Sequence, residues 1–131
     1  MKKTTALRRL LKKKEFVYLP VAYDNRFGFM RRVYAFSRFM AKAVKFVRSH
    51  RDADLCYAIS TPLTTGLAAR RIKHLYGMPY IFEVGDLWPD APVEMGFVRN
   101  SLLQRKLYRM EDNIYRDAVS IVALSPAIRD V

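Results

Sequence analysis

The chain has 131 residues, 51% of them hydrophobic and 27% charged, which is typical of one globular domain and excludes a disordered protein. Its net charge is +12 at pH 7, and its one cysteine, Cys56, excludes a disulfide framework and indicates a reducing compartment. No hydrophobic run reaches the ~18 to 20 residues that a membrane-spanning helix requires.

The positive charge is concentrated in the first part of the chain. Residues 1–51 carry 15 Lys and Arg against Glu15 and Asp24, a net charge of +13, whereas residues 52–131 have a net charge of −1. Residues 1–14, which include seven of these basic residues, are predicted to be a tail that precedes a domain over 15–131. The tail is either a solvated end or a binding arm, and the basic block as a whole suggests an anionic partner.

A strand is predicted over 16–22, where Pro20 favours a sheet edge or the strand end. A helix is predicted over 29–48, because apolar residues recur on one of its faces. Two interpretations of this helix remain open. Either it packs on the core with a solvated basic face, or Phe36 and Phe39 also enter a lipid surface while cations opposite them pair with anionic lipid. Those cations are Arg31, Arg38, Lys42 and Lys45.

A βαβ unit follows, with strands predicted over 54–59 and 79–84 and a helix over 62–76. Ser60 or Thr61 is expected to cap this helix, with Pro62 at its first position. Gly77 supplies its end. Units of this kind build parallel sheets with right-handed crossovers.

The last predicted elements are a helix over 101–116 and a strand over 118–124. Ser101 and Gln104 have the spacing of a capping box, and Glu111 belongs to the charged outer face of this helix. Ser125 then precedes a proline, as at the start of the earlier helix. Taken together, the elements predict an α/β fold, a Rossmann-like three-layer α/β/α arrangement with a parallel sheet.

Polar residues follow several of the predicted strands. In a parallel sheet the carboxyl ends of the strands share one edge, where ligands bind, so Thr61, Asp86, Trp88 and Ser125 are expected to converge there. Each has a plainer alternative: Asp86 caps a turn, and Trp88 packs against its own loop. Glu83 lies within an apolar strand and requires a hydrogen-bond partner or an edge position.

Three stretches of the sequence, STPLTTGLAA, MPYIFEVGDLWPDAPVEMG and AVSIVALSPAIRDV, resemble the N-terminal domain of glycosyltransferase family 4. The branch that the sequence is most similar to contains bacterial enzymes of surface-polysaccharide assembly. The resemblance covers residues 14–131, and its most specific part is 82–96. It implies the GT-B fold and retaining transfer of a sugar from a sugar nucleotide to a lipid-linked acceptor.

If the chain acts on sugars, Asp86 is predicted to accept a hydrogen bond from a sugar hydroxyl in a catalytic role, and Thr61, Glu83, Trp88 and Ser125 are predicted to contact the acceptor. The resemblance also implies a cytoplasmic protein held peripherally on the inner face of the membrane. Relatives place a polar side chain at the position of Gly85, so this chain departs from the family there.

The resemblance further implies a fragment of an N-terminal domain, cut at both sides. Family members bind the sugar nucleotide through an E-x7-E pair in a second domain, and no such pair occurs in this sequence. This chain is therefore expected to contain the acceptor-binding and membrane-binding surfaces and to bind no cofactor itself. It is expected to require the missing donor-binding domain and to show no glycosyl transfer alone.

The sequence offers two other functional classes as alternatives. A basic nucleic-acid-binding module is disfavoured, because the basic helix has no helix-turn-helix partner and its aromatic residues lie on the apolar face. A separate nucleotide-binding domain would require a glycine-rich phosphate motif that the sequence lacks. Two scattered histidines and a strand cysteine do not make a metal site.

Overall fold

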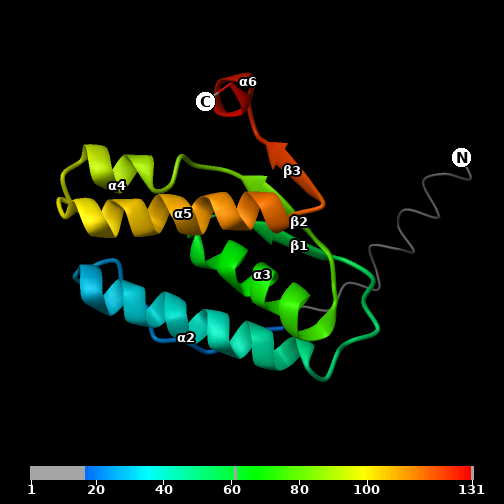
Figure 1. The fold of residues 1–131 in the computed structure, drawn as a ribbon. Helices are drawn as coiled ribbons and strands as arrows, with labels where there is room; N and C mark the ends of the chain where they lie inside the picture. The colour runs from blue at the N-terminus through cyan, green and yellow to red at the C-terminus, as the bar shows by residue number, and fades with distance from the viewer. Residues whose placement is uncertain (1–16, 61, 131) are drawn as a thin grey trace, which may run out of the picture.

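The computed structural model describes residues 17–60 and 62–130. Its centre is a parallel sheet of three strands in the order β1-β2-β3 (Figure 1). The strands are β1 at Cys56–Ile59, β2 at Tyr80–Val84 and β3 at Ser120–Ala123. The predicted parallel sheet is therefore confirmed, with the strand of residues 80–84 between the other two.

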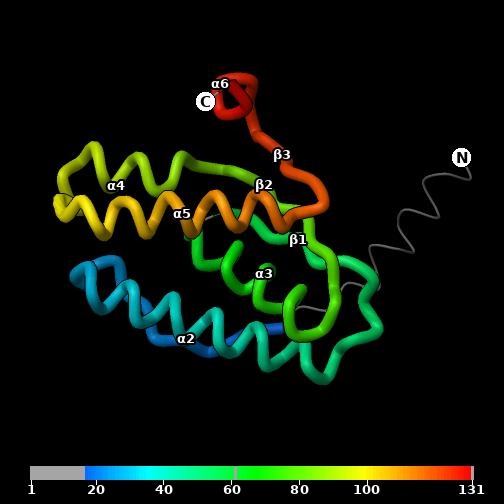
Figure 2. The backbone as a smooth tube through the Cα atoms, viewed as in Figure 1, coloured from blue at the N-terminus to red at the C-terminus, as the bar shows by residue number. Residues whose placement is uncertain are grey.

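Five helices accompany the sheet in the described residues. Figures 1 and 2 show the second of them, α3, lying between α2 and α5, with the short α6 beyond the end of β3. The helices are α2 at Phe29–Val47, α3 at Thr64–Tyr76, α4 at Asp90–Glu94, α5 at Ser101–Asp117 and α6 at Pro126–Arg129.

The core lies between the sheet and the helices α3 and α5. Tyr80, Phe82 and Val84 alternate along β2 with less buried residues, as expected for a strand that turns every second side chain to one face. They pack with Ala69 of α3 and Ile114 of α5. Burial of a side chain as large as Phe82 contributes about 1.5 to 3 kcal/mol, so this cluster is a main source of stability.

Helix α3 approaches the sheet and α5 closely at Gly66. A Cβ atom at this position would lie 2.8 Å from side-chain atoms of both Phe82 and Ile114. Both neighbours are fully buried. The absence of a side chain at Gly66 therefore sets the distance between α3 and the elements that carry the core.

The opposite face of the sheet is less covered. Tyr57, Ile59 and Val122 are exposed there, and Ile81 and Glu83 are half-buried. The Rossmann-like arrangement of parallel strands and crossover helices is confirmed, and in the described part of the chain α3 and α5 pack on the core face of the sheet.

The strand predicted over 16–22 is wrong for residues 17–22, which form no strand. Pro20 has no N–H to donate to a sheet, and its carbonyl accepts a hydrogen bond from Nζ of Lys42 in α2. Tyr23 stacks on Phe36 of the same helix, with ring centroids 5.6 Å apart. The segment therefore packs along α2 instead of extending the sheet.

The helix ends also differ from the prediction in two places. Helix α3 begins at Thr64, two residues later than expected, and no side chain caps it. Helix α5 is capped by Asn100 and not by Ser101: Oδ1 of Asn100 accepts hydrogen bonds from the N–H groups of Leu102 and Leu103. The end of α3 is as predicted, since Gly77 adopts a left-handed φ of 71°.

An ionic cluster joins α3 to the end of α5, at the amino edge of the sheet. Nε of Arg70 donates to Oδ2 of Asp117 at 2.6 Å, and Nε2 of His74 lies 2.9 Å from the same oxygen. Nζ of Lys73 donates to the Asp117 carbonyl. Because these partners come from α3 and the residue that ends α5, the cluster fixes the two helices relative to each other.

Candidate functional site

The carboxyl ends of β1 and β2 are joined through one buried serine. Ser60, which is 2% exposed, directly follows β1. Its Oγ donates a hydrogen bond to Oδ1 of Asp86 at 3.1 Å and accepts one from the N–H of Gly85 at 2.9 Å. Its own N–H donates to the Glu83 carbonyl at 2.8 Å. Ser60 therefore holds the loop that follows β2 and orients the Asp86 carboxylate at this edge.

Two other residues that were predicted to lie at this edge occur in different settings. Trp88 is half-buried and packs against the core cluster of the sheet and helices. Ser125 caps α6, since its Oγ accepts a hydrogen bond from the N–H of Ile128 at 3.3 Å. Thr61 lies outside the described residues.

Glu83 points to the less covered face of the sheet. Its carboxylate accepts a hydrogen bond from the hydroxyl of Tyr57 on the neighbouring strand. This bond and the nearby negative charge raise the pKa of the Tyr57 hydroxyl. The structure therefore supplies the hydrogen-bond partner that Glu83 requires, and it separates Glu83 from the cluster around Asp86.

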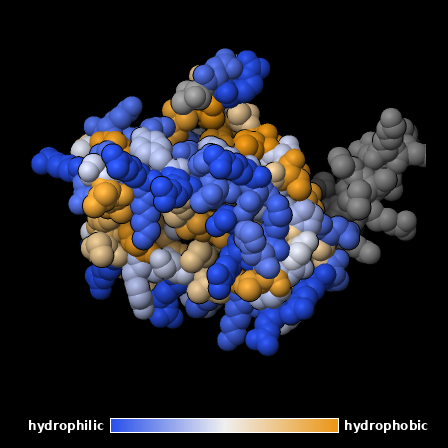
Figure 3. Space-filling model, in the orientation of Figure 1, coloured by the Kyte–Doolittle hydropathy of each residue, from blue (hydrophilic) through white to orange (hydrophobic). Residues whose placement is uncertain are grey.

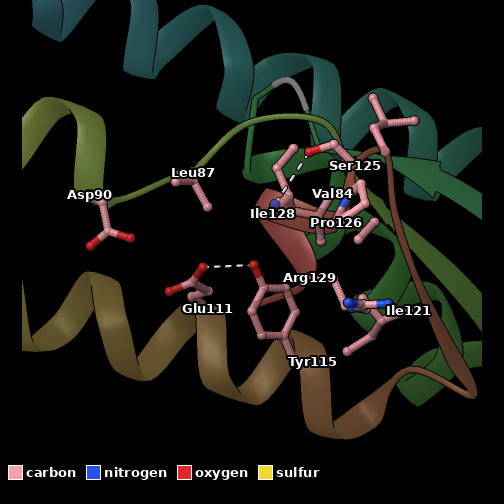
Figure 4. Close-up of a pocket in the computed structure, with 12 residues that line it drawn as sticks. Val84, Leu87, Asp90, Glu111, Tyr115, Ile121, Ser125, Pro126, Ile128 and Arg129 are labelled. Carbon is pink, nitrogen blue, oxygen red and sulfur yellow. Dashed lines mark hydrogen bonds between the residues drawn. The ribbon is translucent and has the colours of Figure 1, made fainter. Parts of the chain in front are cut away.

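A cavity of about 730 Å³ opens beside this cluster, at the carboxyl edge of β2 and β3 (Figure 4). Figure 4 shows Glu111 and Tyr115 rising from α5 on one side and Ser125 and Ile128 on the other. The lining residues are Val84, Leu87, Asp90, Glu111, Tyr115, Ile121, Ala123, Leu124, Ser125, Pro126, Ile128 and Arg129.

Two carboxylates of the cavity are held by tyrosines. The hydroxyl of Tyr115 donates to Oε1 of Glu111 at 2.7 Å, and that of Tyr108 donates to Oδ1 of Asp90 at 2.6 Å. Burial raises the pKa of the Glu111 carboxyl. The hydrogen bond to Asp90 raises the pKa of Tyr108 to about 12. At neutral pH both phenols are therefore neutral donors that fix the carboxylates in place.

The charge of Asp86 acts on Tyr115, one of the residues that line the cavity. Burial is the main cause of a raised pKa at Tyr115, followed by its hydrogen bond to Glu111, and the charges of Asp90 and Asp86 add to the effect. The prediction from sequence placed Glu111 on an ordinary charged face, and this is wrong because the side chain is half-buried. A signal was present in the Glu111–Tyr115 pair, whose i,i+4 spacing puts both residues on one helix face.

The basic face of α2 is a second candidate surface, remote in sequence from the cavity. Arg31, Arg38 and Lys45 are exposed, and beside them Met30 and Tyr34 are 76% and 61% exposed. The guanidinium of Arg38 lies 5.7 Å from the ring centre of Tyr34. Cations and apolar side chains therefore share one solvent-facing side of this helix.

The remaining residues predicted to contact a membrane are less exposed. Phe39 is 40% exposed, whereas Phe36 is half-buried against Tyr23. Lys42 is half-buried, with its ammonium group on the Pro20 carbonyl. The structure thus brings three of the four predicted cations to the open surface of α2.

Within residues 17–60 and 62–130, no three metal-ligating side chains gather in a way that would hold an ion. None of the helices that the structure describes combines the length and apolar content needed to cross a bilayer.

A family described as glycosyl transferase 4-like domain matches residues 6–130. The chain belongs to the glycosyl transferase 4-like family. Searches of curated proteins and of solved structures gave no match. The family supports glycosyl transfer as the general chemistry, and it agrees with the α/β fold and with polar groups at the carboxyl edge of a parallel sheet.

Proposed function

We propose that this glycosyl transferase 4-like domain forms the acceptor side of a retaining enzyme of cell-surface polysaccharide synthesis. The enzyme moves a sugar from a sugar nucleotide to a lipid-linked acceptor. The observation that carries the proposal is the position of Asp86, which Ser60 fixes beside a cavity at the carboxyl edge of the sheet. The family match over residues 6–130 supports glycosyl transfer.

Asp86 has the chemistry to orient an acceptor. A carboxylate accepts hydrogen bonds only, and its two oxygens offer about four lone-pair sites. One bond from Ser60 Oγ to Oδ1 therefore leaves capacity to accept a hydrogen bond from an acceptor hydroxyl. That contact aims the hydroxyl oxygen at the anomeric carbon of the donor, and positioning of this kind can lower a barrier by ~7 to 11 kcal/mol.

The donor is expected to be a sugar nucleotide held by a separate donor-binding domain. The 131 residues contain no E-x7-E pair of the kind that the resemblance assigns to donor binding. No side chain is present at Gly85 to supply a further polar group. We therefore expect this chain to need a donor-binding partner domain before transfer can occur.

A transfer assay tests this division of labour. The purified chain is incubated with radiolabelled sugar nucleotides and a bacterial lipid extract, alone or joined by a flexible linker to a donor-binding domain that contains E-x7-E. We expect counts in the lipid fraction only for the joined protein. Transfer by the chain alone, above a heat-killed control, would contradict the need for a donor domain.

We also propose that α2 holds the domain on the cytoplasmic face of the membrane. Its exposed side combines Arg31, Arg38 and Lys45 with the apolar groups of Met30 and Tyr34. A basic helix face with interspersed apolar side chains binds anionic lipid, with about 1 kcal/mol for each Lys or Arg near the surface. Three such cations correspond to about 3 kcal/mol, a loss of roughly two decades of affinity when they are removed.

Vesicle flotation tests the role of α2. The wild-type chain should bind vesicles that contain phosphatidylglycerol more than vesicles of phosphatidylcholine alone, and salt should weaken this binding. One triple variant replaces the exposed cations of α2, and a control variant of equal net charge replaces three exposed cations of α5. The substitutions are Arg31→Gln, Arg38→Gln and Lys45→Gln against Arg105→Gln, Lys106→Gln and Arg109→Gln.

The two variants distinguish binding through the α2 surface from attraction by the total charge of the protein. We expect the α2 variant to lose most of its binding to anionic vesicles and the α5 variant to retain it. Equal losses in both would show that net charge alone attracts the protein. Undiminished binding of the wild type to neutral vesicles at high salt would contradict the electrostatic contribution.

A further inference from the structure

We infer that the cavity between α5 and the β3–α6 segment binds a neutral sugar ring, so that the group receiving the transferred sugar is itself a saccharide and not a bare lipid phosphate. This inference rests on the proposed function, because it names the chemical class of its acceptor. It depends on three properties of the cavity: a polar wall, an apolar wall and an excess of negative charge.

The polar wall comes from α4 and α5. Glu111 and Asp90 each accept one tyrosine hydrogen bond, at 2.7 Å from Tyr115 and 2.6 Å from Tyr108. Since a carboxylate has about four acceptor sites, both retain sites for further donors. Adjacent hydroxyl groups of a pyranose are such donors. Because the tyrosines fix the carboxylates, little side-chain entropy is lost when a ligand binds.

The apolar wall lies opposite, on β2, β3 and α6. Val84 is buried beneath it, whereas Ile121 remains 47% exposed at the surface of the cavity. Figure 3 shows hydrophobic residues gathered over β3 beneath α6. Ile128 completes this side of the cavity (Figure 4). Together these residues offer aliphatic surface to the C–H face of a pyranose ring.

The size of the cavity also fits a saccharide. Ligand pockets commonly have volumes of about 300 to 1,000 Å³, with mostly apolar walls and a few polar groups that set orientation. The cavity here has about 730 Å³ and both kinds of wall. Two of its lining residues, Val84 and Leu87, flank Asp86 in the sequence, so a ring held in the cavity would lie next to the loop that carries Asp86.

The charge of the cavity distinguishes a sugar from a phosphate. Glu111 and Asp90 face it with carboxylates, and its one cation is Arg129. The guanidinium of Arg129 is already paired, with Nε 2.7 Å from Oδ1 of Asp130. A phosphate monoester would meet unfavourable like charges, whereas a neutral polyol uses the same carboxylates as hydrogen-bond acceptors. The lining therefore selects the neutral ligand.

Saturation-transfer difference NMR on the full chain tests the inference. The probes are the methyl glycosides of glucose, galactose, mannose and N-acetylglucosamine, and inorganic phosphate serves as the competitor. We expect at least one glycoside to receive saturation and phosphate not to displace it. Glu111→Gln should weaken binding about tenfold, because a charged acceptor becomes a neutral amide.

Asp112→Asn on the same helix is the matched control, since its carboxylate pairs with Arg116 outside the cavity at 2.8 Å. It should leave glycoside binding unchanged, and circular dichroism verifies that both variants are folded. Should Glu111→Gln lower the helical signal, Tyr115→Phe takes its place and should weaken binding by several-fold through the freed Glu111 side chain.

Three results would overturn the inference: no saturation of any of the four glycosides, equal binding by the cavity variant and the control, or displacement of the glycoside by phosphate. The assay contains neither donor nor lipid. Failure of sugar transfer would therefore leave glycoside binding intact, and failure of glycoside binding would leave transfer to another class of acceptor open to the assay described above.

Discussion

Substitution of Ser60 by alanine should release the loop that carries Asp86. The variant loses two hydrogen bonds, at 3.1 Å to the Asp86 carboxylate and 2.9 Å from the Gly85 N–H. Each typically contributes about 0.5 to 1.5 kcal/mol, and an N–H left without a partner adds to the loss. Since Gly85 and Asp86 are only half-buried, water replaces part of both bonds. The expected loss of unfolding free energy is about 2 kcal/mol.

Urea denaturation of the purified chain measures this loss, and thermal unfolding gives the matching change in Tm. About 2 kcal/mol corresponds to a fall in Tm of roughly 8 °C for a domain of this size. Ser37→Ala is the control, because Ser37 is exposed on α2 and its Oγ bonds only to the Val33 carbonyl of its own helix. The control should change stability by less than about 0.5 kcal/mol. Equal stability of Ser60→Ala and the control would refute the bridging role of Ser60.

Two further predictions concern the packing of α3. Gly66→Ala should lower the unfolding free energy by about 1 to 2 kcal/mol despite the better helix propensity of alanine, because its Cβ would lie 2.8 Å from Ile114. In a double-mutant cycle measured by denaturation, Gly66→Ala combined with Ile114→Ala should lower the unfolding free energy by less than the sum of the two single changes. Strict additivity would contradict the close contact. Hydrogen bonds to His74 and then Arg70 lower the pKa of the Asp117 carboxyl in the folded state. The ionised carboxylate therefore stabilises the fold fully above the unfolded pKa of about 4, and this contribution is lost as pH falls through the lower folded pKa. Asp117→Asn should therefore reduce stability at pH 6 and leave it nearly unchanged at pH 2, and a deficit that is constant over this range would contradict the linkage.

The central βαβ unit could be predicted from sequence because its signals are local. The apolar runs and Gly77 define β1, α3 and β2 with little help from tertiary contacts, and parallel pairing follows from the connection through a helix. The cap at Ser125 was predictable for the same reason. These elements place the carboxyl edge of the sheet, and with it the neighbourhood of Asp86.

The errors arose where tertiary contacts decide the structure. Residues 17–22 have the composition of a strand, but Lys42 binds the carbonyl of Pro20 and draws the segment along α2. Ser60 is predicted as a helix cap, yet its partner is Asp86 in the loop after β2, which is distant in sequence. The pattern of charges placed Glu111 in solvent, because sequence alone does not show that α6 and β3 close a cavity over it.

The central claim is that Asp86 orients the acceptor for glycosyl transfer. Initial rates of label incorporation into lipid by the joined two-domain protein test it most directly, with Asp86→Asn compared against Asp112→Asn. Asparagine can still accept from Ser60 but lacks the carboxylate charge, so the account predicts at least a tenfold fall in kcat for Asp86→Asn. Asp112→Asn should match the wild type. Equal kcat values for all three proteins would contradict the account.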